Sequence, residues 1–166
     1  FSFCKGLTSV VIPESVTEIG DGAFYYCSNL TGIVILDNVR RIGNSAFSRC
    51  FNIVDITIPS NVAEIGASAF EDCVKLSNVK YQPKACVIKE MTFKGCLSLE
   101  TISIPEGVTR IAKEAFMNCK KLPSISIPSS LNEIGAGAFK NCAVLVECTL
   151  PEGLVSVGKD VFKGCK

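Results

Sequence analysis

Apolar residues recur along the chain at a fixed interval of 23 residues, and polar residues fill most positions between them. The clearest marker is the pair Phe-x-x-Cys. Its Phe residues stand at positions 1, 24, 47, 70, 93, 116, 139 and 162, and each Cys follows three residues later, at 4, 27, 50, 73, 96, 119, 142 and 165. A fixed period of this length is typical of a solenoid, in which each repeat forms one rung that packs on its neighbours.

Apolar and polar residues alternate over four positions within most repeats, as in Asp55-Ile56-Thr57-Ile58. Alternation with a period of two predicts a short strand with one buried face. Proline follows five of these segments and ends the strand. We therefore predict strands over residues 9–12, 32–35, 55–58, 78–81, 101–104, 124–127 and 147–150.

A second apolar pair follows six of the seven predicted strands, for example Val62 and Ile65, and predicts a second short extended piece. A glycine such as Gly66 then lets the backbone bend. The motif Ala-Phe-x-x-Cys has helical spacing and predicts one or two helical turns, with Asp21, Asn44 and Ser68 as candidate N-caps. Because a single repeat is too small to stand alone, the repeats must stack, with parallel strands about 4.8 Å apart.

Residues 99–119 hold the repeat nearly complete, as Leu-x-x-Ile-x-Ile-Pro-x-x-Val-x-x-Ile-x-x-x-Ala-Phe-x-x-Cys. This pattern resembles the BspA-like (Treponema-type) leucine-rich repeat, and the resemblance covers essentially the whole chain. The expected fold is α/β: a right-handed leucine-rich-repeat solenoid of seven 23-residue rungs, with parallel strands on one face and short helical turns on the opposite side. We expect residues 1–166 to form a single solenoid domain cut from a longer array, because the chain begins and ends at nearly the same phase of the repeat.

The repeat between Cys73 and Cys96 departs from the pattern. Tyr81 replaces an inward Ile, Ala85 replaces Val, and Lys89 stands where Gly or Ala is usual. Because a buried Tyr needs a hydrogen-bond partner, we expect a local distortion here. Two interpretations stay open: tolerated drift in one repeat, or a kink that shapes a binding surface.

Composition and charge exclude several classes of protein. The chain is 48% hydrophobic and 20% charged, which is incompatible with intrinsic disorder. Its net charge is +1 and its charges are dispersed, so no footprint for nucleic acid or an anionic membrane is visible. The apolar runs are too short to span a bilayer, so we expect no membrane insertion in this segment.

Eight of the ten cysteines form the single column described above, and Cys86 and Cys148 lie outside it. In stacked rungs their Cα–Cβ bonds would point the same way, which leaves the Cβ atoms too far apart for a good disulfide. We interpret them as small buried apolar groups.

The chain contains no histidine and no Cys-x-x-Cys pair, so we predict no metal site. A general base near neutral pH would need a strongly shifted carboxylate or lysine. Identical loop lengths leave no room for an active-site loop, and no glycine-rich phosphate loop is present. We therefore predict no catalytic residues and no cofactor.

Function is expected on the solvent-facing positions of the first strands, which vary from repeat to repeat. The candidate partner-binding residues are Asp55, Thr57, Asn78, Lys80, Thr101 and Ser103. An ordinary solvated sheet face explains any one of them equally well. A Ser/Thr ladder would suit a glycan or ice, but Asp55, Lys80 and Glu147 interrupt it. A separate column, Glu18, Arg41, Glu64, Val87, Arg110 and Glu133, is expected to form ion pairs between rungs that support the register.

The family resemblance implies secreted or cell-surface proteins of host-associated microbes with roles in adhesion. Our leading hypothesis is a non-catalytic module of an adhesin-like surface protein that binds a protein partner, from the extracellular matrix or from a host or microbial surface. The alternatives are a structural spacer without its own ligand and an intracellular scaffold, which reduced cysteines would suit. Uncapped end rungs would expose apolar side chains and permit end-to-end self-association.

Overall fold

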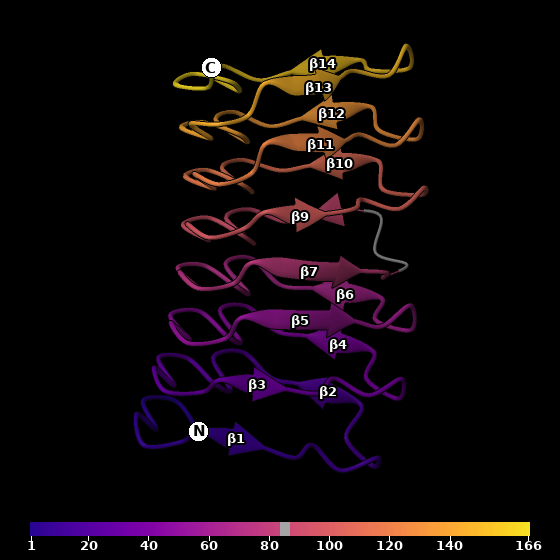
Figure 1. Ribbon diagram of the computed structural model, residues 1–166. Helices are drawn as coiled ribbons and strands as arrows, with labels where there is room; N and C mark the ends of the chain where they lie inside the picture. Colours follow the sequence, from indigo (N-terminus) through magenta and orange to yellow (C-terminus); the bar gives the residue numbers. More distant parts are fainter. Residues whose placement is uncertain (84–86) are drawn as a thin grey trace.

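The chain winds into a rising stack of parallel strands (Figure 1), in a computed structural model that describes residues 1–83 and 87–166. Each turn of the coil contributes one strand to each of two columns. The first column contains β1 (Ser9–Val10), β3 (Gly32–Ile33), β5 (Asp55–Ile58), β7 (Asn78–Tyr81), β9 (Thr101–Ile102), β11 (Ser124–Ser126) and β13 (Glu147–Thr149). The second contains β2 (Glu18–Ile19), β4 (Arg41–Ile42), β6 (Glu64–Ile65), β8 (Val87–Ile88), β10 (Arg110–Ile111), β12 (Glu133–Ile134) and β14 (Ser156–Val157).

All strand pairs are parallel and join residues 23 positions apart, such as Asp55 with Asn78 and Asn78 with Thr101. The parallel-strand solenoid expected from the period is therefore confirmed. Most predicted strands are shorter than expected, because few of them hold regular pairing as far as their fourth residue. The expected count of seven rungs needs correction, since seven strands in a column enclose about six complete turns.

The core lies between the two columns and runs the length of the stack. Eight Phe rings form one continuous pile in which neighbouring centroids lie 5.3 to 5.6 Å apart with nearly parallel planes. The rings of Phe47 to Phe139 are completely buried, whereas Phe1 at the end is 67% exposed. Interior rungs therefore gain packing from both sides, and end rungs from one side only.

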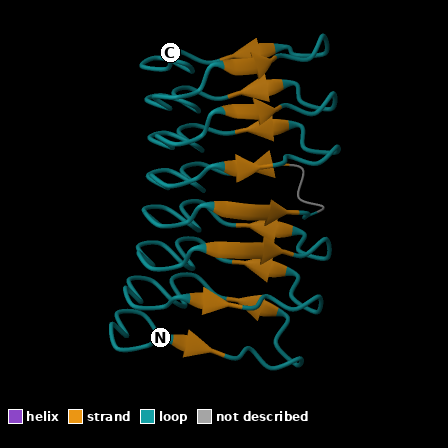
Figure 2. Ribbon diagram, in the orientation of Figure 1, coloured by secondary structure: helices purple, strands orange, loops and turns teal. Residues whose placement is uncertain are grey.

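The predicted helical turns are wrong: the described residues contain no helix, and Figure 2 shows loops and turns on that side of the stack. The reason is two residues per repeat with positive φ, for example Ser45 (51°) and Arg49 (62°), which a right-handed helix does not accommodate. Backbone N–H groups alternate between a turn bond and a bond to the next rung. Ser48 donates to the Ser45 carbonyl at 3.1 Å, whereas Phe47 donates to the Ala69 carbonyl at 2.8 Å.

Two of the three residues expected to cap helices, Asp21 and Asn44, bridge neighbouring rungs with their side chains instead. A carboxylate oxygen of Asp21 accepts the backbone N–H of Asn44 at 2.8 Å, and this bond holds the pKa of Asp21 below its usual value. The side-chain oxygen of Asn44 accepts the N–H of Ala67 at 2.9 Å in the same way. The turn side of the stack is thus a third column of rung-to-rung hydrogen bonds.

The irregular repeat interrupts the second column of strands. The strands β2, β4 and β6 form one sheet and β8, β10, β12 and β14 another, with no pairing between β6 and β8 in the described residues. Lys89 occupies the position of Gly43 and Gly66, where a Cβ would lie within 2.3 to 2.4 Å of backbone atoms of the preceding rung. Ala112 carries a Cβ at the same position of the next repeat while β10 stays paired with β8, so a side chain there does not by itself account for the break.

Tyr81 is buried as its position implies, with 3% of its surface exposed, and its ring meets that of Phe93 edge-on at 6.0 Å. The Tyr81 hydroxyl is a buried polar atom with no hydrogen-bond partner among the described residues. The substitution at Ala85 and the outlying Cys86 fall outside the described residues.

Candidate functional site

The six residues predicted for partner binding all lie exposed on the first column of strands. Asp55 and Thr57 stand on β5, Asn78 and Lys80 on β7, and Thr101 and Ser103 on or directly after β9. Their side chains point outward because the alternate residues, such as Ile56 and Val79, are buried.

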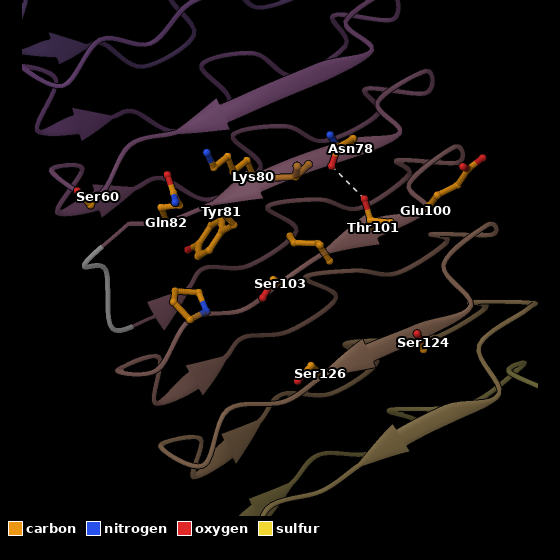
Figure 3. A pocket seen from close by; sticks show the side chains of 13 residues that line it. Ser60, Asn78, Lys80, Tyr81, Gln82, Glu100, Thr101, Ser103, Ser124 and Ser126 are labelled. Atoms are coloured by element: carbon orange, nitrogen blue, oxygen red, sulfur yellow. Dashed lines mark hydrogen bonds between the residues drawn. The ribbon is translucent and has the colours of Figure 1, made fainter.

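Four of the six line one open hollow of about 860 Å³, namely Asn78, Lys80, Thr101 and Ser103. Figure 3 shows these side chains around the hollow, with Ser124 and Ser126 on the following strand. Asp55 and Thr57 are not part of its lining, although they pair in register with Asn78 and Lys80. Ser60, Gln82, Glu100 and the two serines of β11 were not among the predicted residues but contribute to it.

Short side chains explain why the hollow forms where it does. The sequence signal for the missed residues Ser124 and Ser126 was their small size. Together with Ser103, they occupy outward positions at which other repeats carry the larger residues Asp, Lys, Val or Glu. A second hollow of about 490 Å³ shares Ser124 and Ser126 and extends to Glu147 and Thr149. We call the two hollows together the sheet groove.

A hydrogen bond within the sheet groove fixes one of its polar groups. The hydroxyl of Thr101 donates to the side-chain oxygen of Asn78 at 2.9 Å (Figure 3), which leaves the NH₂ group of Asn78 free to donate outward. Lys80 and Asp55 make no ion pair or side-chain hydrogen bond within the described residues. Their charges therefore face solvent.

The charged residues of the second column are arranged differently. Arg41 contacts the carboxylates of Glu18, Asp21 and Glu64, and Glu64 also pairs with Lys89 at 2.5 Å. The Lys89 ammonium, followed by Arg41, lowers the pKa of Glu64. Farther along, the guanidinium of Arg110 lies 3.0 Å from the carboxylate of Glu133. The predicted ionic column is confirmed, and its charged side chains pair with one another between rungs.

The column of cysteines carries an interaction that the sequence did not reveal. Each thiol from Cys27 onward donates to the carbonyl oxygen of the Phe residue 26 positions earlier, as Cys73 does to Phe47 at 3.2 Å. The nine described cysteines are free thiols. Burial raises the pKa of Cys50 to about 12 and that of Cys73 well above its usual value, so these sulfurs stay protonated and unreactive near neutral pH.

The described residues contain no group of three acidic or sulfur ligands positioned to hold a metal ion. They also contain no helix that could cross a bilayer. The polar side chains at the sheet groove are hydroxyls, amides and charged groups, of which Glu100 pairs with Lys121 at 3.5 Å, and such groups suit recognition by hydrogen bonds.

Comparison with known proteins agrees with this architecture. The sequence profile described as BspA type leucine rich repeat region matches residues 1–122 and 86–166, in six copies. The chain belongs to the BspA-type leucine-rich-repeat family. No curated protein matches it by sequence.

Solved structures of bacterial leucine-rich-repeat proteins share the fold. A leucine-rich repeat protein from Eubacterium ventriosum is 28% identical with a TM-score of 0.89, over 95% of this chain and 43% of that one. One from Bacteroides ovatus is 30% identical with a TM-score of 0.75, over 98% and 48%. A leucine rich cell surface protein from Faecalibacterium prausnitzii is 28% identical with a TM-score of 0.53, over 88% and 60%. The chain thus spans less than half the length of the first two relatives.

Proposed function

We propose that this BspA-type solenoid is a non-catalytic binding module of a cell-surface or secreted adhesin-like protein, and that it binds a protein partner through the exposed face of its first column of strands. The observation that carries the proposal is the contrast in charge pairing. Charges in the second column satisfy one another, whereas Asp55, Lys80 and Glu147 on the first face have no ionic partner in the described part of the chain.

Unpaired charges on a flat, polar face set specificity and association rate in protein recognition. Solenoids commonly use such an extended face for binding. A surface location is supported by the leucine rich cell surface protein among the similar structures. The partner class that fits this setting is a protein of the extracellular matrix or of a host or microbial surface.

The test is binding of the 166-residue chain to a panel of immobilised matrix and surface proteins, with charge reversal at Asp55 and Lys80. Reversing either charge should weaken binding roughly two- to tenfold at low salt, because each exposed ion pair contributes about 0.2–1 kcal/mol and reversal replaces attraction by repulsion. Lys113→Glu is the matched control, since Lys113 is exposed on the turn side. Equal effects at all three positions would contradict the proposal.

A structural spacer is the second candidate, and the continuous Phe pile favours it. A core that passes unbroken through the stack gives a rod that could hold other domains away from a surface. A chain that binds no member of the panel, or whose binding ignores changes on the sheet face, would support this function instead.

A further inference from the structure

The sheet groove crosses four successive strands of the first column. It runs from Asn78 and Lys80 on β7, past the hydroxyls of β9 and β11, to Glu147 and Thr149 on β13. Neighbouring parallel strands lie about 4.8 Å apart, so the three steps from β7 to β13 cover roughly 14 Å. The groove is therefore long enough for an extended segment, and it carries hydroxyl, amide or charged side chains on each of its four strands.

The two ends of the sheet groove carry opposite, unpaired charges. Lys80 makes no ion pair or side-chain hydrogen bond in the described residues, and the free NH₂ group of Asn78 adds a second donor beside it. Glu147 at the other end likewise lacks an ionic partner there. A carboxylate fits the first end and a cationic group fits the second.

We propose that the sheet groove binds an extended polypeptide segment of the partner that presents a carboxylate to Lys80 and a cationic side chain to Glu147. Glu147 stands in the same register column as Asn78, two residues from that of Lys80, so the separation of Lys80 and Glu147 is about 16 Å. An extended chain advances about 3.3 Å per residue, so the two side chains stand roughly four to five residues apart. The hydroxyls of Ser103, Ser124 and Ser126 between them both donate and accept, as a peptide backbone requires. The inference rests on the proposed function and specifies its partner's chemistry.

A polypeptide fits this groove better than a glycan. The aromatic residue in the described lining, Tyr81, is buried with its ring against Phe93, so it offers no exposed face on which a sugar ring could stack. The peptide is expected to lie across the strands, because both of its charged contacts lie on the outward face and on different rungs.

The test uses two synthetic dodecapeptides of glycine and serine: one with Asp and Lys four positions apart, the other with Asn and Gln in their places. Binding to the ¹⁵N-labelled chain is followed by NMR at low salt. The charged peptide should shift the amides of residues 78–80, 101–103 and 147–149, and the neutral peptide should bind at least about threefold more weakly. High salt should remove the difference.

Exchanging the charges at the two ends of the groove is the decisive experiment. Lys80→Glu and Glu147→Lys should each weaken binding of the charged peptide about three- to tenfold, and the double variant should restore it because the peptide can bind in the reverse direction. Lys113→Glu should leave binding unchanged. Equal binding of the two peptides, or a double variant as weak as the singles, would overturn the proposal.

The arms also separate this inference from the proposed function. A chain that binds a matrix protein through Asp55 and Lys80 but ignores the charged peptide would leave the module intact and overturn only the peptide chemistry. Shifts at the same amides with neutral or acidic oligosaccharides, in the absence of shifts with the peptide, would assign the groove to glycans and overturn the proposal.

Discussion

Gly66 is the position where the stacking of rungs can be tested most directly. A Cβ placed on Gly66 would lie 2.3 Å from the backbone nitrogen of Asn44 and 2.4 Å from the carbonyl carbon of Gly43, both in the preceding rung. Ordinary contacts of carbon atoms lie at about 3.5–4.0 Å, so one rung would have to move by about 1 Å. Because these are backbone atoms, the contact cannot be relieved by a change of side-chain rotamer.

Overpacking of this kind costs about 1–3 kcal/mol. We expect Gly66→Ala to lower the free energy of unfolding by that amount. With a urea m-value of about 2 kcal/mol per molar, the midpoint should fall by about 0.5–1.5 M.

Gly20 provides the matched control, because it occupies the same position of its own repeat but a Cβ there would meet nothing within 4 Å. Gly20→Ala should therefore change the urea midpoint little. Circular dichroism or Phe and Tyr fluorescence during urea titration gives both midpoints. If the two alanine variants unfold at the same urea concentration, close rung contact at the glycine column is not what limits the spacing, and the reasoning fails.

Three further predictions follow from the core. Phe70→Ala should lower the free energy of unfolding by about 3–5 kcal/mol, because Phe70 is fully buried between two rings. Phe1→Ala should lower it far less, because Phe1 is 67% exposed at the end of the stack. Urea unfolding of both variants measures the difference, and equal losses would contradict the reasoning. Tyr81→Phe should raise the free energy of unfolding by about 1 kcal/mol, since it removes a buried hydroxyl that has no partner among the described residues. A decrease measured by urea unfolding would contradict this reasoning. Burial raises the pKa of Cys73, so this thiol loses its proton first in the unfolded chain, and its contribution to stability should fall above about pH 8.5, by about 1 kcal/mol at pH 9.5. Cys73→Ala should make the urea midpoint depend less steeply on pH in this range, and an unchanged slope would contradict the reasoning.

The columns of cysteine and glycine residues show which interactions the sequence period predicts and which it does not. The period of 23 residues indicates that Cys73 and Gly66 stack on their equivalents in the next rung. It does not reveal that the thiol donates to the Phe47 carbonyl, or that the glycine is needed for close backbone approach, since both depend on the spacing between rungs. The sequence period therefore identifies which residues stack on one another, but not which of their atoms interact.

The turn side was predicted as helical because Ala-Phe-x-x-Cys has helical spacing, and this interpretation was wrong. Backbone N–H groups there gain a partner in the next rung, which a helix would not allow, and this favours turns with left-handed residues such as Ser45 and Arg49. Local spacing could not show this outcome, because the competing hydrogen-bond acceptor belongs to a residue 22 positions later, as Ala69 is to Phe47.

The sequence by itself determined the stack: its period, the two apolar columns, the ionic column from Glu18 to Glu133 and the outward face that carries Asp55 and Lys80. These follow from side-chain chemistry repeated at one interval. Only the tertiary structure decided the absence of helices in the described residues, the break between β6 and β8, and the gathering of Asn78, Lys80, Thr101 and Ser103 around one hollow. Those features depend on how far apart successive rungs settle, which is a balance of packing and hydrogen bonding between residues distant in the chain.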